Sequence, residues 1–194
     1  QEDPASEEVQ MILSEATRCR NIMRGLLDFA RQSRVVKEPT DFAALITEVV
    51  ENMTLKNEAR GLTIRADLDG GLPAVLLDAG QVRQMLVNLV QNGVDAIAGA
   101  PGEVAVSARV HPPGSPLNEA QGIELKVRDT GAGMSQEVLS QMFTPFYTTK
   151  AQGTGLGLAI AKKFTEAHGG VIAASNRPGA GASFRVTLPA LVES

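Results

Sequence analysis

The sequence predicts an α+β fold, a two-layer α/β sandwich in which helices cover one face of a mixed sheet, with a long helix in front of it. Three observations lead to this prediction. Apolar residues recur at helical spacing in some segments and alternate in others. The two kinds of segment follow each other without strict strand–helix alternation. The last two alternating segments flank a short turn, "PGAG", which indicates antiparallel neighbours.

The composition is that of an ordinary globular protein. The chain has 194 residues, of which 43% are hydrophobic and 21% charged. A net charge of −4 argues against a nucleic-acid partner. The single cysteine, Cys19, excludes an internal disulfide and fits a reducing compartment such as the cytoplasm. No apolar run reaches the roughly 20 residues of a membrane span, so we expect no membrane segment in this chain. Whether a longer protein is membrane-anchored is left open.

The first segment, "ASEEVQMILSEATRCRNIMRGLLDFARQSR", predicts one long helix. Its small and apolar side chains recur every three or four residues and form a narrow seam: Val9, Ile12, Ala16, Cys19, Met23, Leu26 and Ala30. Such a seam favours a partner helix outside the segment, and the alternative is a helix that packs on the core of its own domain. The segment "VVKEPTDF" then reads as a linker, so we expect one unit at residues 1–36 and a second at residues 37–194.

The second unit mixes helices and strands. Helices are expected in "FAALITEVVENMTLKNEAR", with Thr40 or Asp41 as its N-cap, and in "AGQVRQMLVNLVQNGVDAIAG", "MSQEVLSQMF" and "LGLAIAKKFTEAH". Strands are expected in "GLTIRADLD", "GGLPAVLLD", "EVAVSARVH", "IELKVRDT", "GVIAASNR" and "GASFRVTLP". The stretch "PPGSPLNEAQG" reads as a loop.

The helix expected at residues 79–99 has two different faces. The apolar face holds Val82, Met85, Leu86, Leu89, Ala96 and Ile97, and the polar face holds Gln81, Gln84, Asn88, Asn92 and Asp95. One interpretation of the polar face is simple solvation. The other is ligand binding, because amide oxygens are hard, neutral ligands suited to Mg²⁺. A neutral ligand leaves the charge of the cation available to phosphate groups.

Two glycine-containing stretches suggest a second and a third contact with a ligand. In "VRDTGAGM", Asp129 ends a strand before Gly131 and Gly133, so a flat ligand could approach the backbone closely. An acceptor-only carboxylate there can receive an exocyclic amine such as that of adenine, and the alternative is a plain turn. In "AQGTGLGLAIAKKF", Gly153, Gly155 and Gly157 precede a helix, whose free N–H groups can bind phosphate. The alternative there is a flexible hinge.

The loop between these stretches is rich in aromatic residues. "FTPFYTTK" contains Phe143, Phe146 and Tyr147 in a chain with few aromatics. These side chains could anchor a mobile segment to the core or form a local cluster. A loop over residues 144–154, between a base site and a phosphate site, is what a lid would look like.

Taken in order, these motifs resemble the N, G1, F and G2 boxes of sensor histidine kinases, members of the GHKL ATPase superfamily. "GASF" resembles the last glycine box, and "RGLLDFARQSR" the end of the second helix of the kinase dimerisation hairpin. The resemblance implies that the first helix is a dimerisation helix and that residues 37–194 bind ATP or ADP. The nucleotide contacts it implies are Asn88, Asn92, Asp95, Asp129, Gly131, Gly133, Met134, Phe146, Thr149, Lys150, Gly153, Thr154, Gly155, Leu156, Gly157, Leu158 and Ser183.

The resemblance also implies a reaction. Asn92 would hold Mg²⁺, and Asn88, Asn92 and Lys150 would form the catalytic set. Hydrolytic relatives carry a water-activating glutamate at the position of Asn88, so its absence favours transfer of the γ-phosphoryl group to a histidine. From that histidine the group would pass to an aspartate of a response regulator. The full-length protein would be a homodimer through residues 5–31. A hydrolytic ATPase and a non-enzymatic scaffold are the alternatives.

The chain departs from the family pattern in its histidines. Family members carry a phosphoacceptor histidine on the first helix of the dimerisation hairpin, and this chain has only His111 and His168. His111 lies at the edge of a Pro/Gly loop and is expected to be solvated. His168 is expected to cap a helix C-terminus with help from the helix dipole. We therefore expect the acceptor helix to be missing from this chain, so that an acceptor must be supplied in trans. The alternative is a protein that has no acceptor at all.

Overall fold

The computed structural model describes residues 4–30, 35–58, 61–97, 101–111, 122–150, 153–176 and 181–189. The elements are, in chain order, α1 (Pro4–Ala30), β1 (Glu38–Thr40), α2 (Phe42–Asn57), β2 (Leu62–Leu68), β3 (Val75–Leu77), α3 (Ala79–Ala96), β4 (Gly102–His111), β5 (Gly122–Asp129), α4 (Gln136–Gln141), α5 (Gly157–Ala167), β6 (Val171–Asn176) and β7 (Ala182–Pro189). Of the expected loop "PPGSPLNEAQG", all but the last residue lies outside the described residues.

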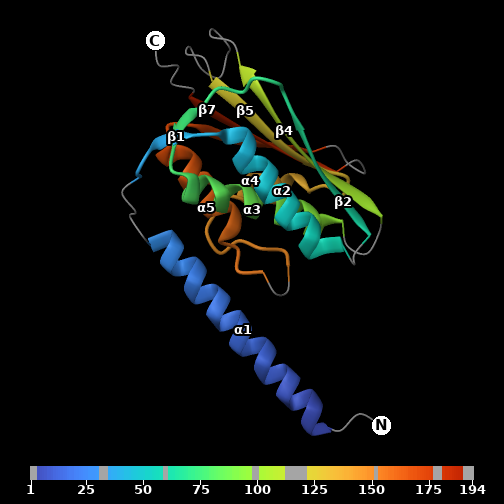
Figure 1. The fold of residues 1–194 in the computed structure, drawn as a ribbon. Helices are drawn as coiled ribbons and strands as arrows, with labels where there is room; N and C mark the ends of the chain where they lie inside the picture. Colours follow the sequence, from blue (N-terminus) through green and yellow to red (C-terminus); the bar gives the residue numbers. More distant parts are fainter. Residues whose placement is uncertain are drawn as a thin grey trace.

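Five strands form one mixed sheet, in the order β2-β4-β5-β7-β6. The β2–β4 pair is parallel and the other pairs are antiparallel, including the expected hairpin of β6 and β7. Helices α2, α3 and α5 cover one face of this sheet (Figure 1). The predicted two-layer α/β sandwich is therefore confirmed.

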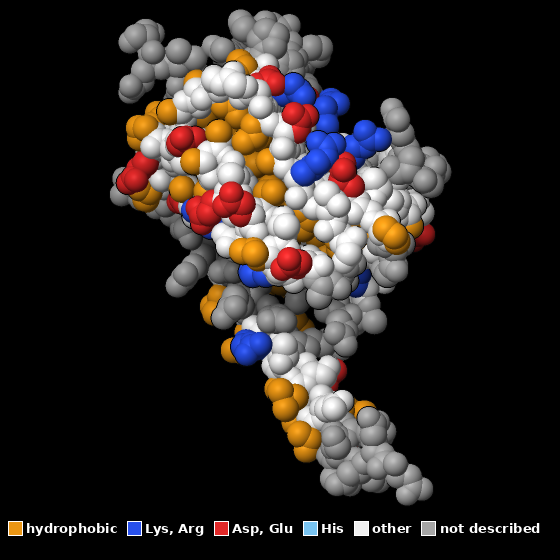
Figure 2. Space-filling view, turned by 45° about the vertical axis from the view of Figure 1, so that its right-hand side comes forward, with side chains coloured by type: hydrophobic (Ala, Val, Ile, Leu, Met, Phe, Trp, Pro, Cys, Tyr) orange, Lys and Arg blue, Asp and Glu red, His pale blue; other side chains and the backbone are white. Residues whose placement is uncertain are grey.

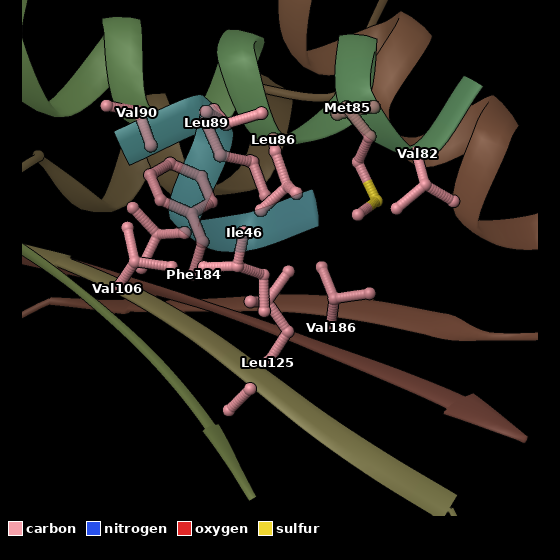
Figure 3. Packing of buried hydrophobic residues seen from close by; sticks show 14 of the residues in the cluster. Ile46, Val82, Met85, Leu86, Leu89, Val90, Val106, Leu125, Phe184 and Val186 are labelled. Carbon is pink, nitrogen blue, oxygen red and sulfur yellow. The ribbon is translucent and has the colours of Figure 1, made fainter. Parts of the chain in front are cut away.

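The core fills the space between the two layers. Figure 3 shows Phe184, Val186 and Leu125 on the sheet pointing toward Met85 and Leu89 on the helices, and all five are buried. Burying a large apolar side chain of this kind contributes about 2 kcal/mol. This packing fixes the position of α3, which carries the expected ligand-binding face, above the middle of the sheet.

Helix α3 begins at Ala79, as its sequence predicts, and its last residue is Ala96, while the predicted end at Gly99 lies outside the described residues. Asp78 is the N-cap, and its side-chain Oδ1 accepts a hydrogen bond of 3.1 Å from the backbone N–H of Gln81. One assignment to the polar face is wrong, because Gln81 is only 9% exposed and its Oε1 has no hydrogen-bond partner. The Gln81 side chain, in the first turn of α3, is therefore buried. The accessible polar face begins further along the helix.

The predicted linker contains a short strand, which was not expected because the segment includes a proline. Residues 38–40 form β1, which pairs with β3 in a separate two-stranded antiparallel sheet. Pro39 is tolerated because β1 is a short strand with only one neighbour. The predicted N-cap of α2 is Asp41, whose Oδ1 accepts a hydrogen bond of 2.9 Å from Ala44 N.

Helix α1 projects away from the sandwich (Figure 1). Its seam is exposed, with Ile12 at 69% and Met23 at 64%, and Figure 2 shows hydrophobic side chains at the surface along the projecting helix. The alternative in which this helix packs its seam on the core of its own domain is therefore wrong. Near its C-terminal end α1 meets α5, where a Cβ on Gly25 would lie 3.0 Å from Leu156 Cδ1.

None of the helices in the described part of the chain is both long enough and apolar enough to span a bilayer.

Candidate functional site

A cavity of about 420 Å³ lies between α3, the end of β5, α4 and the loop before α5. It is lined by Asn88, Gln91, Asn92, Asp95, Ala96, Asp129, Ala132, Gly133, Met134, Val138, Met142, Tyr147, Thr148, Thr149, Lys150, Gly153, Thr154, Gly155, Gly157, Leu158, Ala182 and Phe184. The volume is that of a small-molecule site. The four motifs recognised in the sequence, far apart along the chain, thus line one cavity.

The α3 wall of the cavity ends in a cluster that binds a cation. The Lys150 ammonium donates to Asn92 Oδ1 at 2.9 Å and to Asp95 Oδ2 at 2.7 Å. Asn92 and Asp95 are three residues apart and so share one face of α3. The amide oxygen of Asn92 and the carboxylate of Asp95 together hold this ammonium group, so this donor set fits a cation.

Asn88 joins α3 to the glycine-rich start of α5. Its Nδ2 donates to the backbone oxygen of Gly157 at 3.1 Å, and its Oδ1 accepts from Gln84 Nε2 at 3.2 Å. Asn88 therefore presents an amide to the cavity and has no ionisable group that could take a proton from water. Its hydrogen bonds hold the helix and the glycine segment at a fixed spacing.

Asp129, the last residue of β5, also lines the cavity. It is 2% exposed, and its Oδ1 accepts backbone hydrogen bonds from Gly131 at 2.9 Å and Ala182 at 3.1 Å. Gly181 has a φ of +87°, and a Cβ there would overlap the backbone oxygen of Asp129. The carboxylate is therefore held in one orientation by β7 and by the loop that follows β5.

The start of α5 provides hydrogen-bond donors. Its N-cap, Leu156, makes no side-chain capping bond, and Gly157 and Leu158 in the first turn both line the cavity. Uncapped N–H groups at a helix N-terminus attract anions. The loop before them is closed by the Phe146 N–H, which donates to Gly155 O at 3.0 Å, and Phe146 itself has a φ of +68°.

Four residues of the predicted site do not line the cavity. Leu156 is 1% exposed because its side chain enters the core and faces Gly25 of α1. Phe146 is 58% exposed because its strained backbone turns the ring outward. Gly131 packs against the backbone oxygen of Ala96. Ser183 lies within the sheet, opposite Arg128 and Ser175. Gly131 and Leu156 therefore pack behind the cavity wall.

Sequence reasoning missed several lining residues: Gln91, Ala96, Ala132, Val138, Met142, Thr148, Ala182 and Phe184. Tyr147, considered only as an anchor of the loop, lines the cavity as well. Val138 and Met142 are four residues apart across α4, so helical spacing could have identified them as one face. Ala182 and Phe184 alternate along β7, and the strand period places them on the cavity side.

His168 does not line the cavity. His168 is buried at the C-terminal end of α5, as expected, with Nδ1 2.7 Å from Phe164 O and Nε2 accepting from the Asp78 N–H at 2.9 Å. The ring therefore caps the C-terminal end of α5 by hydrogen bonding, as the sequence predicts. The side chain of His111 lies outside the described residues.

Comparison with known proteins gives a consistent result. The model for histidine kinase-, DNA gyrase B- and HSP90-like ATPases matches residues 77–192. The sensor histidine kinase ZraS of Escherichia coli (strain K12) is 30% identical over 185 residues, which cover 95% of this chain and 38% of ZraS. The chain thus spans well under half the length of this relative.

Solved structures share the fold. Full-length ShkA in complex with AMPPNP has a TM-score of 0.80 and 26% identity, over 100% of this chain and 41% of ShkA. Histidine kinase ThkA in complex with response regulator protein TrrA has a TM-score of 0.78 and 24% identity, over 98% of this chain and 52% of that chain.

The chain belongs to the family of histidine kinase-, DNA gyrase B- and HSP90-like ATPases, on the match to more than half of its length. Within that family it is an ATP-binding catalytic domain of the sensor histidine kinase type, as the motifs around the cavity predict.

Proposed function

We propose that this chain binds Mg·ATP in the cavity and transfers the γ-phosphoryl group to a histidine on a helix that the chain lacks. The observation that supports this most strongly is the arrangement of three different groups around one cavity. A cation-binding amide lies at Asn92, helix N–H donors at Gly157 and Leu158, and a buried carboxylate at Asp129. These groups match the metal, phosphates and base of a nucleotide.

The metal is part of the proposal. Asn92 would hold Mg²⁺ together with phosphate oxygens, because Mg²⁺ takes few protein ligands in nucleotide sites. The ion would neutralise charge on the phosphates during transfer. The ammonium of Lys150 now lies at the Asn92 oxygen, so the oxygen is oriented toward the cavity and suited to a positive charge.

The protein groups would act chiefly by positioning. Asp129 would accept the exocyclic amine of adenine, and the N–H groups at the start of α5 would bind the phosphates. Lys150 would move from Asn92 to the phosphates when nucleotide and metal enter. Asn88 carries no base, so water is not activated and an acceptor nucleophile can compete for the phosphoryl group.

The wider assignments follow from the family. We propose two units, a dimerisation helix at residues 1–36 and a catalytic unit at residues 37–194, with a homodimer formed through residues 5–31 in the full-length protein. A response regulator would accept the phosphoryl group from the histidine, as the complex of ThkA with TrrA suggests. A cytoplasmic location fits this chemistry, because the cytoplasm supplies ATP.

The test separates transfer from hydrolysis. The chain is incubated with γ-labelled ATP and Mg²⁺, with and without a helical hairpin that carries a histidine followed by an acidic residue. Acid-labile label on the hairpin, with slow phosphate release in its absence, is the expected result. Rapid release without any acceptor would identify a hydrolytic ATPase. Calorimetry that detects neither ATP nor ADP binding would leave only a scaffold role.

A further inference from the structure

The loop at residues 131–134, which forms one wall of the cavity, is tied to the edge strand of the sheet by one side chain. Met134 N–H donates to Asn176 Oδ1 at 3.1 Å, and Asn176 Nδ2 donates back to Met134 O. Asn176 is the last residue of β6, 42 residues further along the chain. Both hydrogen-bonding groups of the Met134 backbone are therefore satisfied by a single amide.

In this contact, a side-chain amide makes the two hydrogen bonds that a residue of a neighbouring strand would make in a sheet. A primary amide is the side-chain group that offers a donor and an acceptor in the geometry of a peptide bond. β6 is the outer strand of the five-stranded sheet, and its neighbour on the inner side is β7. The side-chain amide of Asn176 makes a similar pair of hydrogen bonds to the loop that follows β5.

The loop is held at its other end by the site itself. Asp129 Oδ1 accepts from Gly131 N–H and also from Ala182 N–H, and Ala182 is the register partner of Asn176. Asn176 and Asp129 therefore fix the two ends of the same loop against the same hairpin. Between these ends, Gly133 and Met134 line the cavity next to Asp129, which is the proposed base site.

We propose that Asn176 is a positioning residue for the nucleobase, which fixes Met134 and so sets the wall on which the base packs. The proposal rests on the function proposed above. In this proposal Asp129 contacts the exocyclic amine of the base, and Asn176 does not. Loss of the Asn176 amide therefore weakens binding of any purine nucleotide, whereas loss of the Asp129 carboxylate weakens binding of adenine nucleotides selectively.

The experiment compares two ligands by calorimetry in Mg²⁺, ADP and purine riboside 5′-diphosphate, which lacks the exocyclic amine. Asn176→Ala and the isosteric Asn176→Asp should weaken both ligands by the same factor, about ten-fold. Asp129→Asn should weaken ADP more than the purine analogue. The matched control is Asn57→Ala, which removes an amide that donates to Met53 O within α2, away from the cavity, and should leave both affinities unchanged.

Two outcomes overturn the inference in distinguishable ways. If the unmodified chain binds ADP and both Asn176 variants bind it equally well, Asn176 has no positioning role and the proposed function stands. If the unmodified chain binds neither ligand, the proposed function fails and the inference fails with it. Amide exchange of Met134 in the unmodified protein gives an independent check in case a variant does not fold. Protection is expected, and exchange at the rate of a free amide overturns the inference.

Discussion

Lys150 Nζ lies 2.9 Å from Asn92 Oδ1 and 2.7 Å from Asp95 Oδ2, so the loop before α5 is fastened to α3 by an ammonium group. The Lys150 and Asp95 side chains are 42% and 32% exposed, so water screens their attraction and the pair can separate at little cost. A doubly charged cation bound with phosphates would displace the ammonium, which frees Lys150 to meet those phosphates.

The first prediction concerns that lysine. Lys150→Met should release the loop in the nucleotide-free protein and remove a cation from the phosphates of bound nucleotide. We expect faster amide exchange over residues 144–150 and an ATP affinity reduced by about ten-fold, since a hydrogen bond to a charged group contributes about 1.5–3 kcal/mol. Lys126→Met is the matched control, because Lys126 pairs with Glu124 on β5 and does not line the cavity. Equal behaviour of the two variants would contradict the assignment.

The second prediction concerns base selectivity at Asp129. Its Oδ1 receives two backbone N–H groups, so in Asp129→Asn the amide oxygen should keep that position and the NH₂ group should face the ligand. A donor there opposes the amine of adenine and suits the carbonyl of hypoxanthine. We therefore expect the ratio of ADP to IDP affinity, measured by calorimetry, to fall by at least about ten-fold. An unchanged ratio would show that the base does not meet Asp129.

The third prediction concerns Gly155. Its φ is +66°, and a Cβ there would overlap the backbone of Phe146. Gly155→Ala should therefore weaken ATP binding and lower the melting temperature. Gly61→Ala is the control, because Gly61 has the same φ of +66° and open space around it. Both variants share the left-handed strain of about 1–2 kcal/mol, so the difference between them isolates the contact with Phe146. Equal ATP affinities and equal melting temperatures in the two variants would mean that the backbone of Phe146 can move aside without cost.

The fourth prediction concerns stability alone. His168→Ala removes a buried ring that joins the C-terminus of α5 to Asp78, the N-cap of α3. The Asp78 N–H would lose its partner, whereas the Phe164 oxygen would keep the backbone N–H of residue 168, and we expect the free energy of unfolding to fall by about 1–3 kcal/mol. Urea denaturation measures this loss. His168→Gln should recover part of it, and a variant as stable as the parent would show that the ring is dispensable.

Local patterns predicted the elements of the fold well. The helical period of α3 and α5 and the alternation of β6 and β7 are strong signals, because each element buries one face against the same core. The failures occur where a side chain's surroundings depend on the tertiary structure. Gln81 has the period of a surface residue, yet it is buried by structure that the helix alone does not reveal. The β1 strand has three residues, including Pro39, and no local period at all.

The sequence motifs predicted which residues would form the candidate site, but only some of the contacts between them. Asn92 was proposed because an amide-rich helix face is unusual, whereas Asp129 and the glycines, which are common in turns, were proposed because the order of the motifs resembles a known family. Lys150 was predicted as a candidate phosphate partner, but its present contact with Asn92 joins residues 58 positions apart, which no local pattern contains. Asn176 was missed for the same reason, since an asparagine at a strand end reads as an ordinary turn former.

The close approach of Asp129 to Gly181, and of Ala96 to Gly131, has a consequence for how this site can change. In each pair, the space that one motif leaves empty is filled by the backbone of another. Every residue type has this backbone, so no substitution at Asp129 or Ala96 makes room for a side chain at Gly181 or Gly131. A second mutation in the opposing motif should therefore not rescue a substitution of either glycine. Over evolutionary time these two glycines should stay fixed even where the residues opposite them change.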